Sequence, residues 1–155
     1  MNLHATRVTW IGLAMLVLSV IGFGLSAAYH LVTCVTPEGC RLAGSATGLG
    51  VALWPGGTAV EPPWFITLVF AGGLLLSSVV RGIGLLGTIV VFLYGVLWIA
   101  GEGSEGLTRW AYSNNFGIGL FLFMQTVAAG GTVLAAGWEL VDRIRNGLRL
   151  PAGAH

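Results

Sequence analysis

The sequence predicts an all-α integral membrane protein: a four-transmembrane-helix bundle with both termini cytoplasmic and a disulfide-pinned outer loop between helices 1 and 2. Hydrophobic residues make up 55% of the 155 residues and charged residues only 8%, whereas soluble chains carry about 25% charged residues. Because so few ionic side chains cannot cover a soluble particle, lipid must face most of the surface. The net charge of +1 argues against nucleic-acid binding.

Four apolar stretches are long enough to cross a bilayer as helices, and charged residues lie only at their ends. They cover about residues 8-32, 63-81, 83-101 and 114-142, which leaves outer loops at about 33-62 and 102-113 within one transmembrane domain, 1-155. About 20 residues span a hydrocarbon core about 30 Å thick at 1.5 Å per residue. Residues 89–93 lack the alternation of a barrel strand, which argues against a membrane β-barrel.

The first stretch resembles a signal peptide, because a charged start and the small residues 26–28 flank an apolar run. The run is longer than the roughly 7–15 residues of a signal-peptide core, so we interpret it as a true span. Pro62 and Pro63 suit the start of the second span, and Arg81-Gly82 leaves room only for a tight turn before the third. Tryptophans near the span ends are typical of interfacial anchors: Trp10, Trp64, Trp98, Trp110 and Trp138.

The distribution of arginine predicts the orientation. With four spans, the side that holds both termini carries Arg7, Arg81, Arg143, Arg145 and Arg149, and the other side carries Arg41 and Arg109. An excess of basic residues marks the cytoplasmic side. Together with the small size and the use of arginine alone as the basic residue, this pattern suggests a bacterial inner (plasma) membrane.

The first outer loop is too long for a simple connector. It contains Cys34 and Cys40, with a predicted β-turn between them, and an exterior pair joined by a turn favours a disulfide. A thiol oxidoreductase is the alternative, but such enzymes typically use Cys-x-x-Cys and a second pair. Residues 48–54 are apolar and glycine-rich, and we expect a strand or a segment that lies on the membrane or on a partner.

Two side chains could contact a cofactor or ligand. His30 lies at the outer end of the first span, where it could cap the helix or ligate haem or a pigment. Gln125 lies near the middle of the fourth span and should face another helix, since an unsatisfied amide in lipid is costly. It could bond another helix or contact a quinone or substrate. We predict no cofactor and no metal; haem, pigment or quinone remain alternatives.

Charged residues at the cytoplasmic ends of the spans could form an ion pair, with Arg81 opposite Glu139 or Asp142. Such rim charges can reach water. The interior of the spans lacks the Asp, Glu or Lys that a proton-coupled carrier would carry. This weighs against an autonomous transporter.

Small residues recur four positions apart within three spans, and such pairs let membrane helices approach closely. The pairs are Gly22 with Ser26, Gly73 with Ser77, and Gly131 with Ala135. Many packing features and no reactive cluster favour a non-catalytic accessory or structural subunit of a larger membrane complex. We expect a bacterial energy-converting or transport complex, with lipid and other membrane subunits as the partners of this chain. The alternatives are a small carrier or channel component and a cofactor-binding redox subunit.

Overall fold

The computed structural model describes residues 7–31, 44–53, 55, 58, 61–79, 81–103 and 116–148. This part of the chain is all-helical and contains no strand. Within it, three helices are long and apolar enough to cross a membrane, over Arg7–Tyr29, Ile83–Gly101 and Phe116–Arg145. Their backbones satisfy their own hydrogen bonds, as segments surrounded by lipid must.

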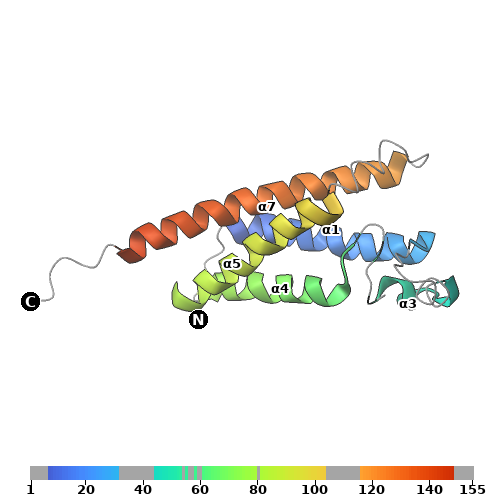
Figure 1. Cartoon of the computed structure of the whole chain (residues 1–155), viewed down its shortest axis with the longest axis horizontal. Helices are drawn as coiled ribbons and strands as arrows, with labels where there is room; N and C mark the ends of the chain where they lie inside the picture. Colours follow the sequence, from blue (N-terminus) through green and yellow to red (C-terminus); the bar gives the residue numbers. More distant parts are fainter. Residues whose placement is uncertain are drawn as a thin grey trace, which may run out of the picture.

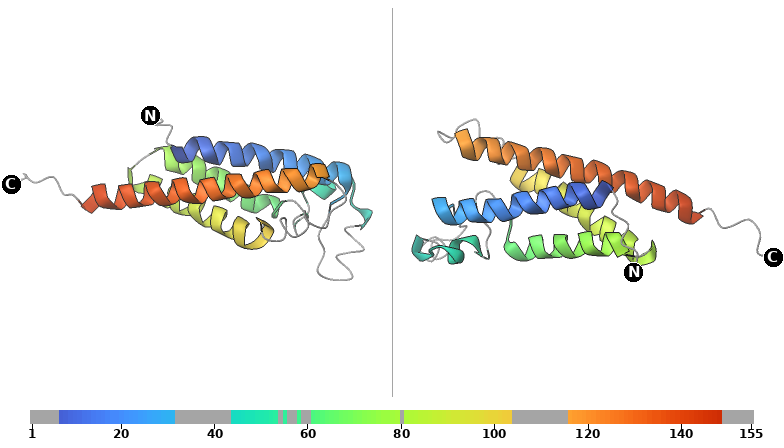
Figure 2. Two further views of the ribbon diagram at one scale, coloured as in Figure 1. Left: turned by 90° about the horizontal axis from the view of Figure 1, so that it is seen from above. Right: turned by 180° about the vertical axis from the view of Figure 1, so that it is seen from behind.

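The main helices are α1 (Arg7–Tyr29), α4 (Trp64–Val79), α5 (Arg81–Trp98) and α7 (Phe116–Leu148). The most extensive contacts join α4 to α5, α5 to α7, α7 to α1 and α1 to α4, so each of these helices packs against two neighbours. In Figure 1, α1, α4 and α7 run lengthwise and α5 crosses diagonally between α4 and α7. The two further views in Figure 2 show the same bundle.

The two ends of this bundle differ in what they carry (Figure 1). At one end, called the loop end here, α1 finishes, α4 and α7 begin, and the short helix α3 (Leu49–Ala52) packs on α1. At the other end, the hairpin end, α4 passes into α5. The helix α7 has 33 residues and runs on past the hairpin end toward the C-terminus.

Local residues explain where the helices begin and end. α1 stops at His30, which has a positive φ of 54°, and the Leu31 amide donates to the Ser26 carbonyl oxygen at 3.0 Å. This is the six-to-one bond of a helix C-cap with a left-handed residue. α4 begins directly after two prolines, and the Ile66 amide donates to the Pro63 carbonyl at 2.9 Å. After Trp98, α5 continues as a π-helical turn, η1 (Ile99–Gly103).

The α4–α5 hairpin is held by backbone contact. A Cβ added at Gly87 would collide with the Ser77 amide nitrogen and would lie 2.6 Å from the Gly73 carbonyl oxygen. Only glycine allows two helix backbones to approach this closely. The observed turn leaves a single residue, 80, between α4 and α5.

The centre of the bundle is apolar and aromatic. Phe70 of α4 stacks on Tyr94 of α5, with ring centroids 4.2 Å apart and an interplanar angle of 18°. Met15, Val91 and Ala129 are fully buried around this pair. The outward faces carry large exposed apolar side chains, among them Val20, Leu68, Leu97 and Leu134, on each of the four helices.

Two local expectations differ from the structure. Within residues 48–54, the chain forms the helix α3 rather than a strand, and Val51 and Ala52 are buried. Trp98 is only 2% exposed and belongs to the core, whereas Trp10 and Trp138 are 65% and 69% exposed. Trp98 therefore packs in the buried core cluster with Phe70 and Tyr94 instead of anchoring an interface.

Candidate functional site

The side chain of Glu61 lies inside the bundle. Glu61 immediately precedes the two prolines that open α4, yet it is 0% exposed. Its carboxyl group sits against Gly22 of α1, so closely that a Cβ on that glycine would collide with the carboxyl oxygen Oε1. The absence of a side chain at Gly22 makes the space that this carboxyl group occupies. A charged side chain at such a place is expensive and is a functional candidate by default.

Gln125 of α7 approaches the same carboxyl group from the opposite helix. The Gln125 Nε2 donates a hydrogen bond to Glu61 Oε1, and Gln125 is also 0% exposed. The bond joins residues 64 positions apart in the sequence. Glu61 therefore links the start of α4 to both α1 and α7.

Two hydroxyl groups extend this polar cluster toward the loop end. The Ser26 Oγ donates to the Gly22 carbonyl oxygen at 2.8 Å and lies 2.8 Å from Thr58 Oγ1. The Glu61 amide donates to Thr58 Oγ1 at 3.0 Å, and the Thr58 amide donates to the Glu61 carbonyl oxygen at 2.8 Å. These bonds fix the backbone before α4 onto α1, which sets the position from which Glu61 reaches inward.

We call Gly22, Ser26, Thr58, Glu61 and Gln125 the polar cluster. It lies within the bundle rather than at its rim, because Gly22 is about 10 Å from the end of α1 and Gln125 about 13 Å from the start of α7 at 1.5 Å per residue. The Gln125 Oε1 is buried and has no hydrogen-bond partner among the described residues. The cluster thus retains a free acceptor next to the carboxyl group.

The hairpin half of the bundle contains buried hydroxyls of a different kind. Each donates to a carbonyl of its own helix: Ser77 to Leu74, Thr88 to Gly84 and Thr132 to Ala128, all at 2.8 Å. Such internal bonds satisfy the hydroxyl without help from another helix. Among the described residues, these three buried hydroxyls of the hairpin half are therefore already engaged and are not free to act on a ligand.

An arginine organises the rim at the hairpin end. The Arg143 Nε donates to Glu139 Oε1 at 2.8 Å, and its terminal Nη2 donates to the Ser77 carbonyl oxygen at 2.9 Å. The second bond satisfies one of the last carbonyls of α4, which have no partner within the helix. The other terminal nitrogen packs on Gly84 of α5.

The structure describes only the acidic side chains of the predicted rim ion pair. Glu139 pairs with Arg143 of its own helix, while Asp142 is exposed. The side chain of Arg81 lies outside the described residues, as do Cys34 and Cys40, so the disulfide remains a prediction.

The structure does not bring the two predicted ligand contacts together. His30 is exposed at the end of α1, where its backbone conformation ends the helix. Gln125 is buried and bonded to Glu61. Among the described residues, no group of three or more His, Cys, Asp or Glu side chains could hold a metal ion.

The three predicted small-residue pairs meet different neighbours. Gly22 and Ser26 face the segment with Thr58 and Glu61 rather than a helix. Gly73 and Ser77 face α5 at the Gly87 contact. Gly131 and Ala135 face α1, with Ile11 Cγ2 3.5 Å from a Cβ built on Gly131.

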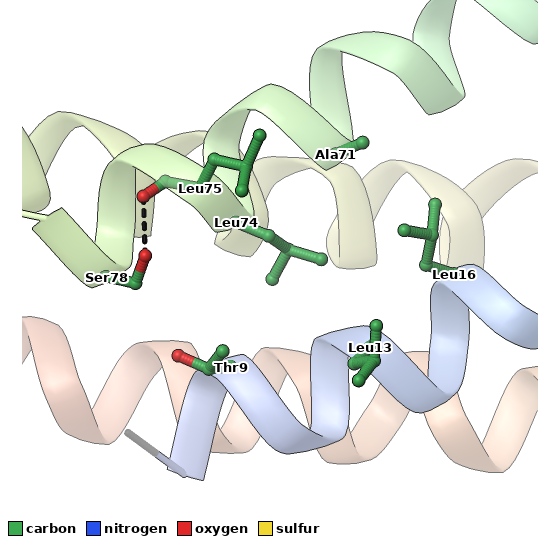
Figure 3. Close-up of a pocket in the computed structure, with 7 residues that line it drawn as sticks. All are labelled: Thr9, Leu13, Leu16, Ala71, Leu74, Leu75 and Ser78. Carbon is green, nitrogen blue, oxygen red and sulfur yellow. Dashed lines mark hydrogen bonds between the residues drawn. The ribbon is translucent and has the colours of Figure 1, made fainter. Parts of the chain in front are cut away.

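A groove lies between α1 and α4 in the hairpin half (Figure 3). Its volume is about 320 Å³, and its lining is almost wholly apolar: Thr9, Leu13, Leu16, Ala71, Leu74, Leu75 and Ser78. The Ser78 hydroxyl is engaged with the Leu75 carbonyl at 2.7 Å. The groove can hold hydrocarbon but has no group for chemistry.

Glu61 is the site residue that sequence reasoning missed. Residue 61 falls in the outer loop predicted at about 33-62, and a charge in such a loop beside two prolines is expected at the surface. Two features of the sequence could have indicated the buried site. Gln125 needs a hydrogen-bond partner inside the bundle, and Gly22 leaves space for a side chain. Nothing in the linear pattern connected Glu61 to either of them.

Comparison with known proteins found no match: no protein-family model, no curated protein and no solved structure is similar to this chain. The function must therefore be argued from the bundle and the polar cluster.

Proposed function

We propose that this chain is a non-catalytic accessory subunit of a larger membrane complex, an energy-converting or transport complex of a bacterial inner membrane. All four main helices would span the bilayer, with the hairpin end and both termini on the cytoplasmic side. The observation that carries the proposal is the tight packing of the hairpin half, which leaves no polar path among the described residues. There α4 and α5 touch through backbone atoms at Gly87, and the buried hydroxyls bond within their own helices.

A carrier needs polar groups that reach both surfaces of the membrane. Apart from the bond from Arg143 to the Ser77 carbonyl at the partly exposed rim, the interhelical side-chain hydrogen bonds of the described residues gather in the loop half, whereas the hairpin half is packed around Phe70, Leu74 and Val91. This distribution supports a packing role over a conducting one. The large apolar side chains on the outer faces of all four helices supply surface for lipid and for other subunits alike.

The four-span arrangement includes α4, which has 16 residues. It would extend about 24 Å as a regular helix, so the residues before it, with buried Pro62, would complete the crossing. Two single cysteines on exposed positions test the arrangement in a background without Cys34 and Cys40. Asp142→Cys should react with an impermeant maleimide only from the cytoplasmic side, and Leu49→Cys only from the outer side. Labelling of both from one side would refute it.

Site-specific photo-crosslinking in native membranes tests the subunit role. A photoreactive residue is placed singly at Val20, Leu68, Leu97 or Leu134, which are exposed positions on the four helices. We expect one or two faces to capture the same protein reproducibly and the others to capture lipid. Val91, fully buried, is the matched control and should capture only this chain. Lipid alone at all four exposed positions, with a lone monomer after mild solubilisation, would contradict the proposal.

A small carrier is the second candidate, because the buried carboxyl group of Glu61 faces Gln125 inside the bundle. Reconstituted vesicles test it by flux measurements. A flux that disappears in Gln125→Leu and persists in Glu139→Gln, at the rim of the hairpin end, would favour the carrier over the subunit. No flux above that of protein-free vesicles would leave the subunit proposal in place.

A further inference from the structure

Glu61 and Gln125 form a pair that can accommodate either protonation state of a carboxyl group. In the structure the Gln125 Nε2 donates to Glu61 Oε1, which is the bond that an ionised carboxylate accepts. The Gln125 Oε1 is buried and has no hydrogen-bond partner among the described residues. A protonated carboxyl group is a donor and needs such an acceptor. The Gln125 amide therefore has a donor, Nε2, for the ionised carboxylate and an acceptor, Oε1, for the protonated carboxyl group.

We propose that the polar cluster is a proton-binding site, in which Glu61 takes up and releases one proton and Gln125 is the positioning residue. A hydronium ion at the loop end gives up the proton, which binds one carboxylate oxygen: one O–H bond breaks, one forms and a water molecule is left, and release of the proton reverses the step. In the ionised state Nε2 donates to the carboxylate. In the protonated state the carboxyl O–H donates to Oε1 after the amide turns over. This inference goes beyond the subunit role and holds for a subunit or a carrier.

The tight packing of the carboxyl group favours a proton over a metal cation. On one side lies Gly22, where a Cβ would collide with Oε1 and would stand 2.7 Å from Glu61 Cγ and Cδ. On the other side lies the Gln125 amide. A sodium ion would need several oxygen ligands and room of its own between them. A proton needs only the carboxylate oxygen and an acceptor beside it.

The arrangement of polar groups points to the loop end as the source of the proton. From Glu61 the polar atoms continue through Thr58 to Ser26, near the end of α1. In the other direction the core is filled by Met15, Phe70 and Val91, which are fully buried. Water at the hairpin end therefore lies beyond an apolar layer.

The charged and titratable groups on the elements around Glu61 are few. α5 presents Tyr94, which is buried and stacked on Phe70. α1 carries Tyr29 and His30 at its exposed end, and the loop halves of α4 and α7 carry no titratable side chain. η1, which continues α5 in the loop half, carries Glu102, and the remaining described charges lie at the hairpin end or beyond it. A titration in the loop half of the described part of the bundle can thus be assigned to Glu61, Glu102 or Tyr94: the tyrosine differs in its infrared bands, and Glu102→Gln distinguishes the second carboxyl group from Glu61.

Infrared spectroscopy of the full chain in phospholipid vesicles, with pH stepped, tests the proposal. We expect a carboxylic-acid C=O band that grows as pH falls, shifts in deuterated water, and is absent from Glu61→Gln. The matched control Glu139→Gln, at the rim, should keep the band. Gln125→Leu should keep it with its midpoint displaced by about tenfold in proton affinity, since the bond from Nε2 to a charged oxygen is the stronger of the two.

Three outcomes would overturn the proposal. The first is an unchanged band in Glu61→Gln; the second is no titrating interior carboxyl band at any pH at which the protein stays helical. The third is a band that responds to sodium at constant pH, which would indicate a metal-cation site. If Glu61→Gln does not fold, the titration midpoint of the carboxyl band in Gln125→Leu is the test. A displaced midpoint supports the proposal, and an unchanged midpoint refutes the role of the pair.

Discussion

The loop half and the hairpin half of the bundle are held together by different forces. In the loop half, side-chain hydrogen bonds between segments far apart in sequence join α1, α7 and the start of α4, through Ser26, Thr58, Glu61 and Gln125. In the hairpin half, contacts between backbones and apolar side chains dominate, and hydroxyls bond within their own helix. In the loop half, the arrangement of the helices is therefore set by buried polar groups that need hydrogen-bond partners. In the hairpin half, it is set by close backbone contacts that only glycine permits.

The difference matters because the two kinds of contact respond differently to change. A close backbone contact cannot yield, since neither helix can move without losing its other neighbours. A side-chain hydrogen bond can rearrange, as the amide of Gln125 can turn over beside Glu61. The hairpin half is thus suited to be a fixed frame and the loop half to change state.

The largest expected effect comes from breaking the frame. Gly87→Ala places a Cβ against the Ser77 amide nitrogen and the Gly73 carbonyl oxygen, which are backbone atoms that cannot give way. We expect a loss of about 3 kcal/mol or more in the free energy of unfolding, measured by SDS titration from mild detergent. Gly72→Ala, where nothing lies within 4 Å of the new Cβ, is the control and should stay within about 0.5 kcal/mol. Equal stability of the two variants would contradict the backbone contact.

A smaller effect is expected in the loop half. Gly22→Ala also collides, but with the Glu61 side chain from Cγ to Oε1, which can move more readily than backbone. We expect a loss of about 2 kcal/mol from overpacking and a broken hydrogen bond to Gln125. Gly24→Ala, two residues along α1 with nothing within 4 Å, is the matched control. If Gly22→Ala costs as much as Gly87→Ala, the loop half is as rigid as the hairpin half and the contrast fails.

The fold could be predicted from the sequence further than the site could. Long uncharged runs follow from the demands of lipid, and they place the helices within a few residues: 8-32 was expected where α1 runs Arg7–Tyr29, and 114-142 where α7 runs Phe116–Leu148. The pattern of glycines indicated close packing, yet it could not say which glycine meets a backbone and which meets a side chain.

The polar cluster depends on tertiary structure that no local pattern contains. The sequence indicates that Gln125 needs a partner inside the membrane. The partner comes from residue 61, in a segment that Thr58 and Ser26 fix onto α1. A charge beside two prolines is ordinarily solvated, so the long-range contact overrides the local expectation. The same holds for Trp98, which packs in the buried core cluster although it lies near the end of a span.

A third prediction concerns the rim of the hairpin half. Arg143→Gln removes the bond to the Ser77 carbonyl and the pair with Glu139. Because both side chains are partly exposed, we expect a loss of only about 1 kcal/mol. Arg145→Gln, two residues along and exposed, should change the SDS-unfolding midpoint by less than half as much. A neutral Arg143→Gln would show that the backbone contacts alone hold this end of α4.

The smallest effect is expected at the end of α1, where the loop half begins. His30 has a positive φ of 54°, a conformation in which glycine avoids the strain of a Cβ. His30→Gly should therefore stabilise the protein by up to about 0.5 kcal/mol, part of the gain being lost to the greater freedom of glycine in the unfolded chain. The same change one residue earlier, Tyr29→Gly, falls in the last turn of α1 and should destabilise by about 1 kcal/mol. Opposite signs at adjacent positions would show that His30 ends the helix by its backbone. A loss on His30→Gly would instead mean that the imidazole itself makes a contact that stabilises the loop half.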